Sequence, residues 1–226
     1  MSATNGTNED GSARSPIEVA WFAALCDDDY EFLGVPDPAL QSSWDHCSAI
    51  VEKADAHGFD NVLLPSGYAL GIDNTAFAAA VAIRTRAIRL LLAIRMGELV
   101  APQVVRQVAT LQQIAGGRLV VNVISSDLPG ETLDSEPRYR RSTEYMHVIR
   151  ELLEGRPVDF HGEFLELTLD PPRVAVEGSG CPPYYFGGLS PAARECAARA
   201  ADVFLMWPDV VDKVLEVKAD MDARAE

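Results

Sequence analysis

The sequence predicts an α/β fold in which helices cover a parallel β-sheet. Short, almost continuously apolar runs alternate with segments of helical periodicity, and six such strand–helix units follow one another without a long linker. Two architectures remain open: an open doubly wound sheet, and a (β/α)₈ barrel, which needs eight units and typically about 250 residues. An inserted β-hairpin near residues 158–169 favours the barrel. No Gly-x-Gly-x-x-Gly string follows the first strand, which weakens a dinucleotide-binding sheet.

In the first half of the chain, each strand and helix is predicted from the local pattern of apolar residues. Short apolar runs predict strands over residues 17–25, 61–64, 88–94 and 119–124. Apolar residues that recur every three or four positions predict helices over residues 44–57, 75–85, 102–115 and 140–153. Gly58 ends the first of these helices, and Pro102 is a favourable first-turn residue of the third.

The pattern changes in the second half. The runs 158–160 and 164–169 flank His161-Gly162 and predict the hairpin. Two more units follow, with strands over residues 184–186 and 203–207 and helices that begin at Ser190 and near Val210. Ser190 is a helix N-cap with Pro191 at the first helical position. Residues 16–226 are therefore expected to form one domain, after a polar tail over residues 1–15 that is expected to be disordered.

Composition and charge exclude some function classes. Of the 226 residues 48% are hydrophobic and 23% are charged, so a sizeable core is expected. The net charge of −15 repels phosphate backbones and anionic lipids, so neither nucleic-acid nor membrane binding is expected. The four cysteines are widely spaced without a Cys-x-x-Cys pair, which indicates free thiols in a reducing cytoplasm and no metal site.

The sharpest local signal runs from Tyr185 to Pro191: a strand end, two glycines and a capped helix. Gly187 and Gly188 allow a ligand to approach the backbone, and the N–H groups at the helix start carry partial positive charge. The segment Gly187-Gly188-Leu189-Ser190 could therefore hold a phosphate group even in an acidic protein. The alternative is a tight turn between strand and helix with an ordinary cap.

Three further polar residues follow or interrupt apolar strands. Ser66 comes directly after the second strand, at the edge where barrel enzymes carry their sites. Asn122 lies inside an apolar strand, where it either contacts a cofactor or is a satisfied core residue. Arg95 ends the third strand and either receives an anionic substrate or forms a surface salt bridge. For Trp21, Phe22 and Trp207, core packing is the expectation, with contact to a flat cofactor as the alternative.

In their order and spacing, these strings resemble the bacterial luciferase-like flavin monooxygenases, and within them the alkanesulfonate monooxygenase branch. The resemblance covers roughly residues 17–226. The matching strings are Val19-Ala20-Trp21-Phe22, Ala54-Asp55 through Gly58-Phe59, Leu63-Leu64-Pro65-Ser66-Gly67, Leu92-Ala93-Ile94-Arg95, Arg106-Gln107-Val108-Ala109-Thr110-Leu111, Gly117-Arg118, Asn122, Arg138-Tyr139, Val158-Asp159-Phe160-His161-Gly162 and Pro183-Tyr184-Tyr185-Phe186-Gly187-Gly188-Leu189-Ser190.

The resemblance implies a (β/α)₈ barrel of the TIM-barrel type, of which this chain contains about six units. It also implies reduced FMN (FMNH₂) from a separate NAD(P)H flavin reductase, and O₂ for oxygenation of a small organic substrate, in this branch an alkanesulfonate. Ser66 and Asn122 resemble the contacts to the flavin, and Tyr139 with Gly187 to Ser190 resembles the grip on its phosphate. A cytoplasmic homo-oligomer is expected.

The departures concern the substrate side. The branch carries a cysteine shortly after the second strand, where this chain reads Tyr68-Ala69-Leu70-Gly71, and its later arginine, histidine and tyrosine residues have no counterpart. Apart from Arg95, the expected substrate contact is Cys26 or Tyr30 in the first loop, and the catalytic residues are unassigned. The chain is therefore expected to be a C-terminally truncated member and, alone, a poor monooxygenase. The alternative is a shortened, non-catalytic flavin-binding protein.

Overall fold

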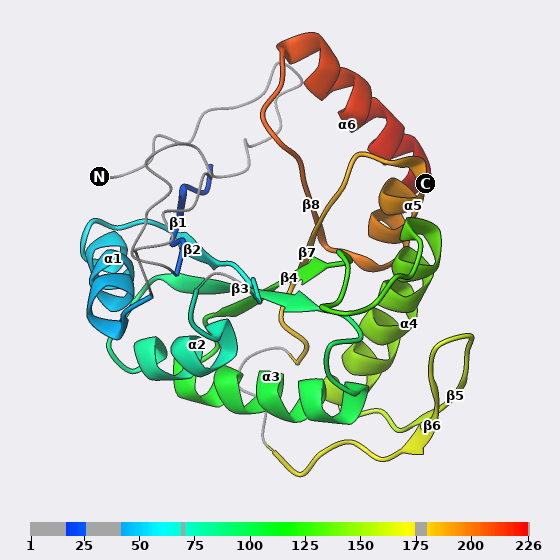
Figure 1. Ribbon diagram of the computed structural model, residues 1–226, viewed down its shortest axis with the longest axis horizontal. Coiled ribbons are helices and arrows are strands. Elements are labelled where there is room, and N and C mark those ends of the chain that lie inside the picture. Colours follow the sequence, from blue (N-terminus) through cyan, green and yellow to red (C-terminus); the bar gives the residue numbers. More distant parts are fainter. Residues whose placement is uncertain (1–16, 26–41, 69–70, 175–179, 226) are drawn as a thin grey trace, which may run out of the picture.

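The computed structural model describes residues 17–25, 42–68, 71–174 and 180–225. Its centre is a six-stranded parallel sheet in the order β1-β2-β3-β4-β7-β8. This order follows the chain, as in a barrel, and does not reverse direction as in a doubly wound sheet. The sheet curls into a half-barrel with α1 to α5 on its outside (Figure 1). The predicted barrel-type α/β fold is therefore confirmed, and the doubly wound alternative is wrong.

All six predicted strand–helix units are present. The strands of the sheet are β1 Ala20–Phe22, β2 Asn61–Leu64, β3 Arg89–Arg95, β4 Leu119–Ile124, β7 Tyr184–Gly187 and β8 Val203–Leu205. The helices are α1 Trp44–Ala56, α2 Asn74–Ala82, α3 Ala101–Ala115, α4 Ser135–Leu153, α5 Pro191–Ala200 and α6 Val211–Ala225.

Two elements differ clearly from their predicted bounds. β1 has three residues where nine were expected, because it pairs only through Ala20 to Phe22 with β2. α4 begins at Ser135 and not at Arg140. Pro137 was expected to precede the helix, but it lies in the first turn, where the missing N–H would have no partner within the helix.

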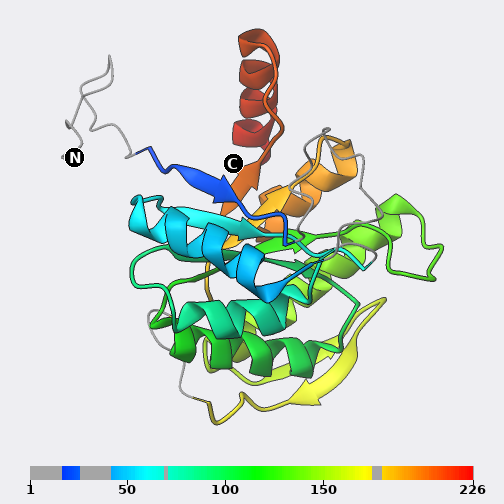
Figure 2. The same cartoon turned by 60° about the vertical axis from the view of Figure 1, so that its left-hand side comes forward.

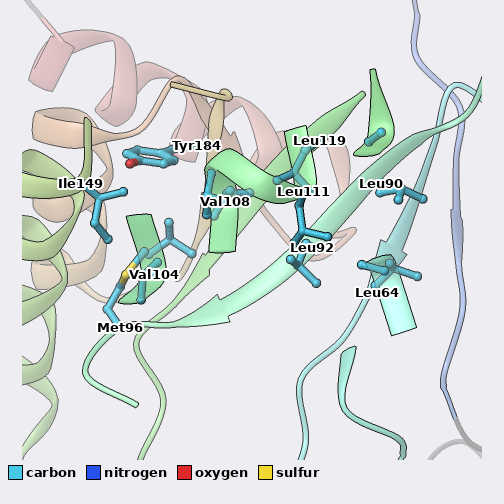
Figure 3. Close-up of a cluster of buried hydrophobic side chains, with 14 of the residues drawn as sticks. Leu64, Leu90, Leu92, Met96, Val104, Val108, Leu111, Leu119, Ile149 and Tyr184 are labelled. Atoms are coloured by element: carbon cyan, nitrogen blue, oxygen red, sulfur yellow. The ribbon is translucent and has the colours of Figure 1, made fainter. Parts of the chain in front are cut away.

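The hydrophobic core lies between the sheet and the outer helices (Figure 3). Leu90 and Leu92 of β3 are fully buried there against α3 residues that include Val104 and Val108. Because side chains alternate along a strand, the residues between these core positions point to the opposite, concave side of the sheet. This side is called the inner face below, and Ala93 is one of its residues.

The predicted hairpin is present as β5 Val158–His161 and β6 Glu166–Leu169, an antiparallel pair outside the main sheet. The Glu144 carboxylate of α4 accepts hydrogen bonds from the N–H groups of Glu163, Phe164 and Leu165, at 2.7, 2.9 and 3.0 Å. The turn of the hairpin is therefore fixed to α4.

The expectation of core packing for the aromatic residues at the strand ends is wrong. Trp21 and Phe22 of β1 are 49% and 50% exposed, and Trp207, which follows β8, is 82% exposed. Both strands lie at edges of the sheet, so within the described part of the chain one flank of each is uncovered. The helices of the described residues also include none that is long and apolar enough to cross a membrane.

Candidate functional site

Ser66 stands where β2 leaves the sheet. The pairing of β2 with β3 ends at Leu64 and Leu92, so the Ala93 carbonyl has no partner in that ladder. The buried Asn74, in the first turn of α2, donates to the carbonyls of Ala93 and Leu64 at 2.7 and 3.3 Å. This amide satisfies the strand ends and lets the chain turn away at Ser66 while β3 continues.

Arg95 ends β3 and contacts both neighbouring strand ends. Its guanidinium donates to the Ser66 hydroxyl and the Ser66 carbonyl, both at 3.3 Å, and to the Ser126 hydroxyl at 3.1 Å. Glu98 lies 3.3 Å away as an ion-pair partner, and the Arg95 side chain is only 9% exposed. The structure thus brings together two residues that the sequence proposed separately, Ser66 and Arg95. Arg95 is neither simply a contact for an anionic substrate nor simply part of a surface salt bridge, because most of its N–H donors bond to protein acceptors.

Asn122 points to the inner face, since its neighbours Val121 and Val123 enter the core. In register it lies between Ala93 of β3 and Tyr185 of β7. The side chain is half-buried, and among the described residues its amide has no hydrogen-bond partner. Within the described residues, Asn122 is therefore not a satisfied core residue, and its side chain faces the concave side.

The turn from β7 into α5 forms a small cradle. Gly188 has φ +153°, and a Cβ there would stand 2.6 Å from the Ala193 Cβ, so no side chain fits. The Tyr139 hydroxyl lies 3.7 Å from the same position, and its ring packs edge-on against Phe186 at 6.1 Å. Ser190 caps α5 as predicted, its hydroxyl accepting from the Ala193 N–H at 3.2 Å. A hydroxyl, exposed backbone and a helix N-terminus therefore converge at one point.

The loop after β4 links these two parts. The Ser125 hydroxyl lies 2.5 Å from the Ser142 hydroxyl of α4, and the Ser125 carbonyl accepts from Arg138 at 2.9 Å. Arg138 also donates to Asp127 and to the Leu133 carbonyl. Since Tyr139 follows Arg138 in α4, polar residues line the carboxyl edge of the sheet from Ser66 to Tyr139, whose hydroxyl lies beside Gly188. This continuous edge is called the rim below.

The opposite end of the inner face holds a second polar group. Glu18, just before β1, accepts from Arg89 at 2.7 Å, from Tyr185 at 3.2 Å and from Asn61 at 3.5 Å. The hydrogen bond to Glu18 raises the pKa of Arg89. Burial first, and then the charge of Glu18, raise the pKa of Tyr185. These residues connect β1 with β7 across the inner face, although β2, β3 and β4 lie between these two strands in the sheet.

Some expectations lie outside the described residues, and some contacts were missed. Cys26 and Tyr30, the other expected substrate contacts, fall in the range 26–41 that the structure does not describe. Sequence reasoning did not assign a role to Asn74 or Ser126. For Ser126, the available signal was a polar residue close after an apolar strand. For Asn74, it was an amide side chain directly after the helix cap Asp73.

With this geometry, comparison with known proteins assigns the family. The sequence profile described as luciferase-like monooxygenase matches residues 32–226, which is most of the chain. The chain belongs to the luciferase-like monooxygenase family. The resemblance inferred from the sequence strings is confirmed.

Two proteins named sulfoquinovose monooxygenase are similar to the chain in sequence. The protein from Novosphingobium aromaticivorans is 61% identical over 220 residues, which cover 94% of this chain and 61% of that protein. The protein from Agrobacterium fabrum is 46% identical over 202 residues, which cover 88% of this chain and 52% of that protein. The chain thus spans between half and two thirds of the length of these relatives.

Solved structures agree on the fold. A riboflavin lyase superposes with a TM-score of 0.80 at 17% identity, covering 93% of this chain and 59% of that one. A long-chain alkane monooxygenase superposes with a TM-score of 0.76 at 17% identity, covering 94% and 61%. At this identity the likeness shows the fold alone, and the chain covers about three fifths of each of these structures.

Proposed function

We propose that the chain is part of a flavin-dependent monooxygenase that uses reduced FMN and O₂ to oxygenate an organosulfur compound. The observation that carries this proposal is the 61% identity to a sulfoquinovose monooxygenase over 94% of the chain. The rim supports it, because its polar groups suit a ligand with one phosphate and one polar ring system. Sulfoquinovose, a sugar that carries a sulfonate, is therefore the first substrate to test.

The residues fit an FMN phosphate on their own geometry. Gly188 leaves the backbone open, Tyr139 offers a hydroxyl beside it, and the first turn of α5 offers N–H groups. Gly187, Leu189 and Ser190 would complete the phosphate contact. Ser66 and Asn122 would contact the ring system, since the Asn122 amide lacks a partner among the described residues.

When bound, reduced flavin supplies the electrons that activate O₂, and the protein supplies binding, orientation and exclusion of water. In this chain, orientation would come from the strands: Ser66 follows the end of β2 and Asn122 lies on β4, and these two strands flank β3. A separate NAD(P)H flavin reductase as the source of FMNH₂, a homo-oligomeric assembly and a cytoplasmic location belong to the same proposal.

The first experiment tests the phosphate position. Gly188→Asp places a bulky carboxylate where Ala193 leaves no room, and its charge repels phosphate. We expect FMN and FMNH₂ to bind the variant at least about tenfold more weakly than the unchanged protein, in an anaerobic fluorescence titration. Gly155→Asp is the matched control, because Gly155 also has a positive φ, +79°, but has open space around it.

The outcomes separate the parts of the proposal. Equal FMN binding by Gly188→Asp and by the unchanged protein would remove the phosphate assignment. Tyr139→Phe deletes one oxygen and tests the same position if the aspartate variant does not fold. Sulfite release from sulfoquinovose, with a flavin reductase and NAD(P)H, tests the activity. FMN binding without sulfite release from any sulfonate, in the longest polypeptide that the gene encodes, would favour a non-catalytic flavin-binding protein.

A further inference from the structure

Arg95 joins three separate segments of the rim. Its planar guanidinium donates hydrogen bonds to the hydroxyl and the carbonyl of Ser66 and to the hydroxyl of Ser126. It also donates to the carboxylate of Glu98, three residues further along the chain. Arginine is suited to such a task because its five N–H donors lie in one rigid plane. A lysine carries its three donors on one nitrogen atom, so it cannot span the acceptors that Arg95 reaches from three nitrogen atoms.

Two features argue against a free cation that awaits an anionic substrate. Glu98 already faces the Arg95 charge at 3.3 Å, so a substrate anion would compete with a carboxylate. The Arg95 side chain is also only 9% exposed, and four of the five guanidinium donors have protein acceptors. A sulfonate would thus have to break contacts that hold the rim.

We infer that Arg95 is a positioning residue for the flavin: it fixes Ser66 at the end of β2 and Ser126 at the end of β4. Ser126 follows Ser125, whose hydroxyl and carbonyl are bound by Ser142 and Arg138 of α4. Arg95 therefore aligns one proposed ring contact, Ser66, with the helix that carries Tyr139. This inference rests on the proposed function for its ligand and on the hydrogen bonds for its geometry.

The test compares Arg95→Lys, Arg95→Met and Ser126→Ala in the full-length protein, with FMN as the probe. We expect both arginine variants to weaken FMN binding about tenfold or more, because each loses charge-assisted hydrogen bonds to two strand ends. Ser126→Ala loses one of these bonds, so a smaller effect in the same direction is expected. Arg156→Met, at an exposed ion pair beyond the end of α4, is the matched control and should bind FMN like the unchanged protein.

A second readout needs no flavin. Without ligand, amide hydrogen exchange in residues 64–68 and 124–127 should accelerate in Arg95→Lys and Arg95→Met, and stay unchanged in Arg156→Met. In turnover, positioning predicts that the KM for FMNH₂ rises and that sulfonated and uncharged substrates are affected equally. A direct ligand for the substrate predicts a selective rise in the KM for sulfonates, with FMN binding intact.

The results decide each claim separately. Wild-type FMN affinity in Arg95→Lys and Ser126→Ala, or unchanged exchange in both loops, would overturn the positioning role. If the unchanged protein itself binds no FMN, the proposed function fails, and the exchange measurement still decides whether Arg95 holds the two strand ends. Ser126→Ala removes a single oxygen, so it remains informative if the arginine variants are unstable.

Discussion

The middle of the sheet and its two edges differ in how well the described chain covers them. β3 pairs with strands on both sides, and its residues Leu90 and Leu92 are fully buried. β1 and β8 each pair on one side within the described residues, and Trp21 and Trp207 beside them are largely exposed. The middle is thus ordered by contacts within this chain, whereas in the described part of the chain the edges present apolar surface and unpaired backbone.

The helices next to the two edges, α1 and α6, are also incompletely covered within the described chain. A cavity of about 430 Å³ lies between β1 and α1, with mostly apolar residues around it, including Trp21, Ile50 and Phe59. At the other edge α6 stands away from α1 to α4 (Figure 2), and Val217 is its buried residue while Leu215 is 56% exposed. The rim belongs to the covered middle, so changes to its polar groups should alter binding more than folding.

The largest expected effect tests the comparison directly. In the 226-residue chain, Leu92→Ala should lower the free energy of unfolding by about 2–5 kcal/mol, because it leaves a cavity in the core. Leu215→Ala is the matched change at the exposed edge, and we expect a loss within about 0.5 kcal/mol. Urea denaturation followed by circular dichroism measures both. Similar losses would mean that the edge is covered in solution.

The sequence predicted best what depends on neighbours along the chain. The bounds of β2 and β4 were predicted to the residue, because their apolar runs stop at Pro65 and at Ser125. The Ser190 cap followed from its own string in the same way. β1 was overestimated, because an apolar run shows where a strand could extend but not how far its partner follows.

The site was predictable in its parts but not in its connections. Ser66, Arg95 and Ser126 are about thirty positions apart, and they meet only because β2, β3 and β4 are neighbours in register. Likewise, the lack of a partner for the Asn122 amide among the described residues depends on which side chains share the inner face. Sequence patterns carry neither the register nor the packing of distant segments.

An intermediate effect is expected at Asp55, which ties α1 to the chain that enters β3. Its carboxylate accepts from the N–H groups of Arg86, Ala87 and Ile88 at 2.9, 3.0 and 2.7 Å. Burial works to raise the pKa of Asp55, but these three hydrogen bonds outweigh it and hold the pKa below the usual value. Asp55→Asn should cost about 1–3 kcal/mol at pH 7, towards the lower end because the carboxylate is partly exposed.

The stability contribution of the Asp55 carboxylate should depend on pH. Because the pKa of Asp55 is lowered in the folded state, its contribution is present above the unfolded value of about 3.9 and is lost as the pH falls below it. The stability difference between the unchanged protein and Asp55→Asn should therefore be constant from pH 7 to about 5 and should shrink towards pH 3. Asp222→Asn, at an exposed ion pair on α6, is the control and should show no measurable difference. A difference that does not shrink at all between pH 5 and pH 3 would contradict the assignment.

The smallest effect is expected at a contact between the edge strand β1 and β7, the strand next to the other edge. The Tyr185 hydroxyl of β7 donates to Glu18, which precedes β1 on the far side of the sheet. Tyr185→Phe should cost about 0.5–1 kcal/mol, because it removes one partly exposed hydrogen bond and leaves the core intact.

The raised pKa of Tyr185, caused first by burial and then by Glu18, gives this variant its own signature. The folded state favours the neutral phenol, so stability should fall more steeply above about pH 10 in the unchanged protein than in Tyr185→Phe. Hydrogen exchange should accelerate at residues 18–22 and stay unchanged at residues 90–94, because only the edge depends on this contact. Acceleration in both segments would show that the middle of the sheet relies on its edges and would break the comparison.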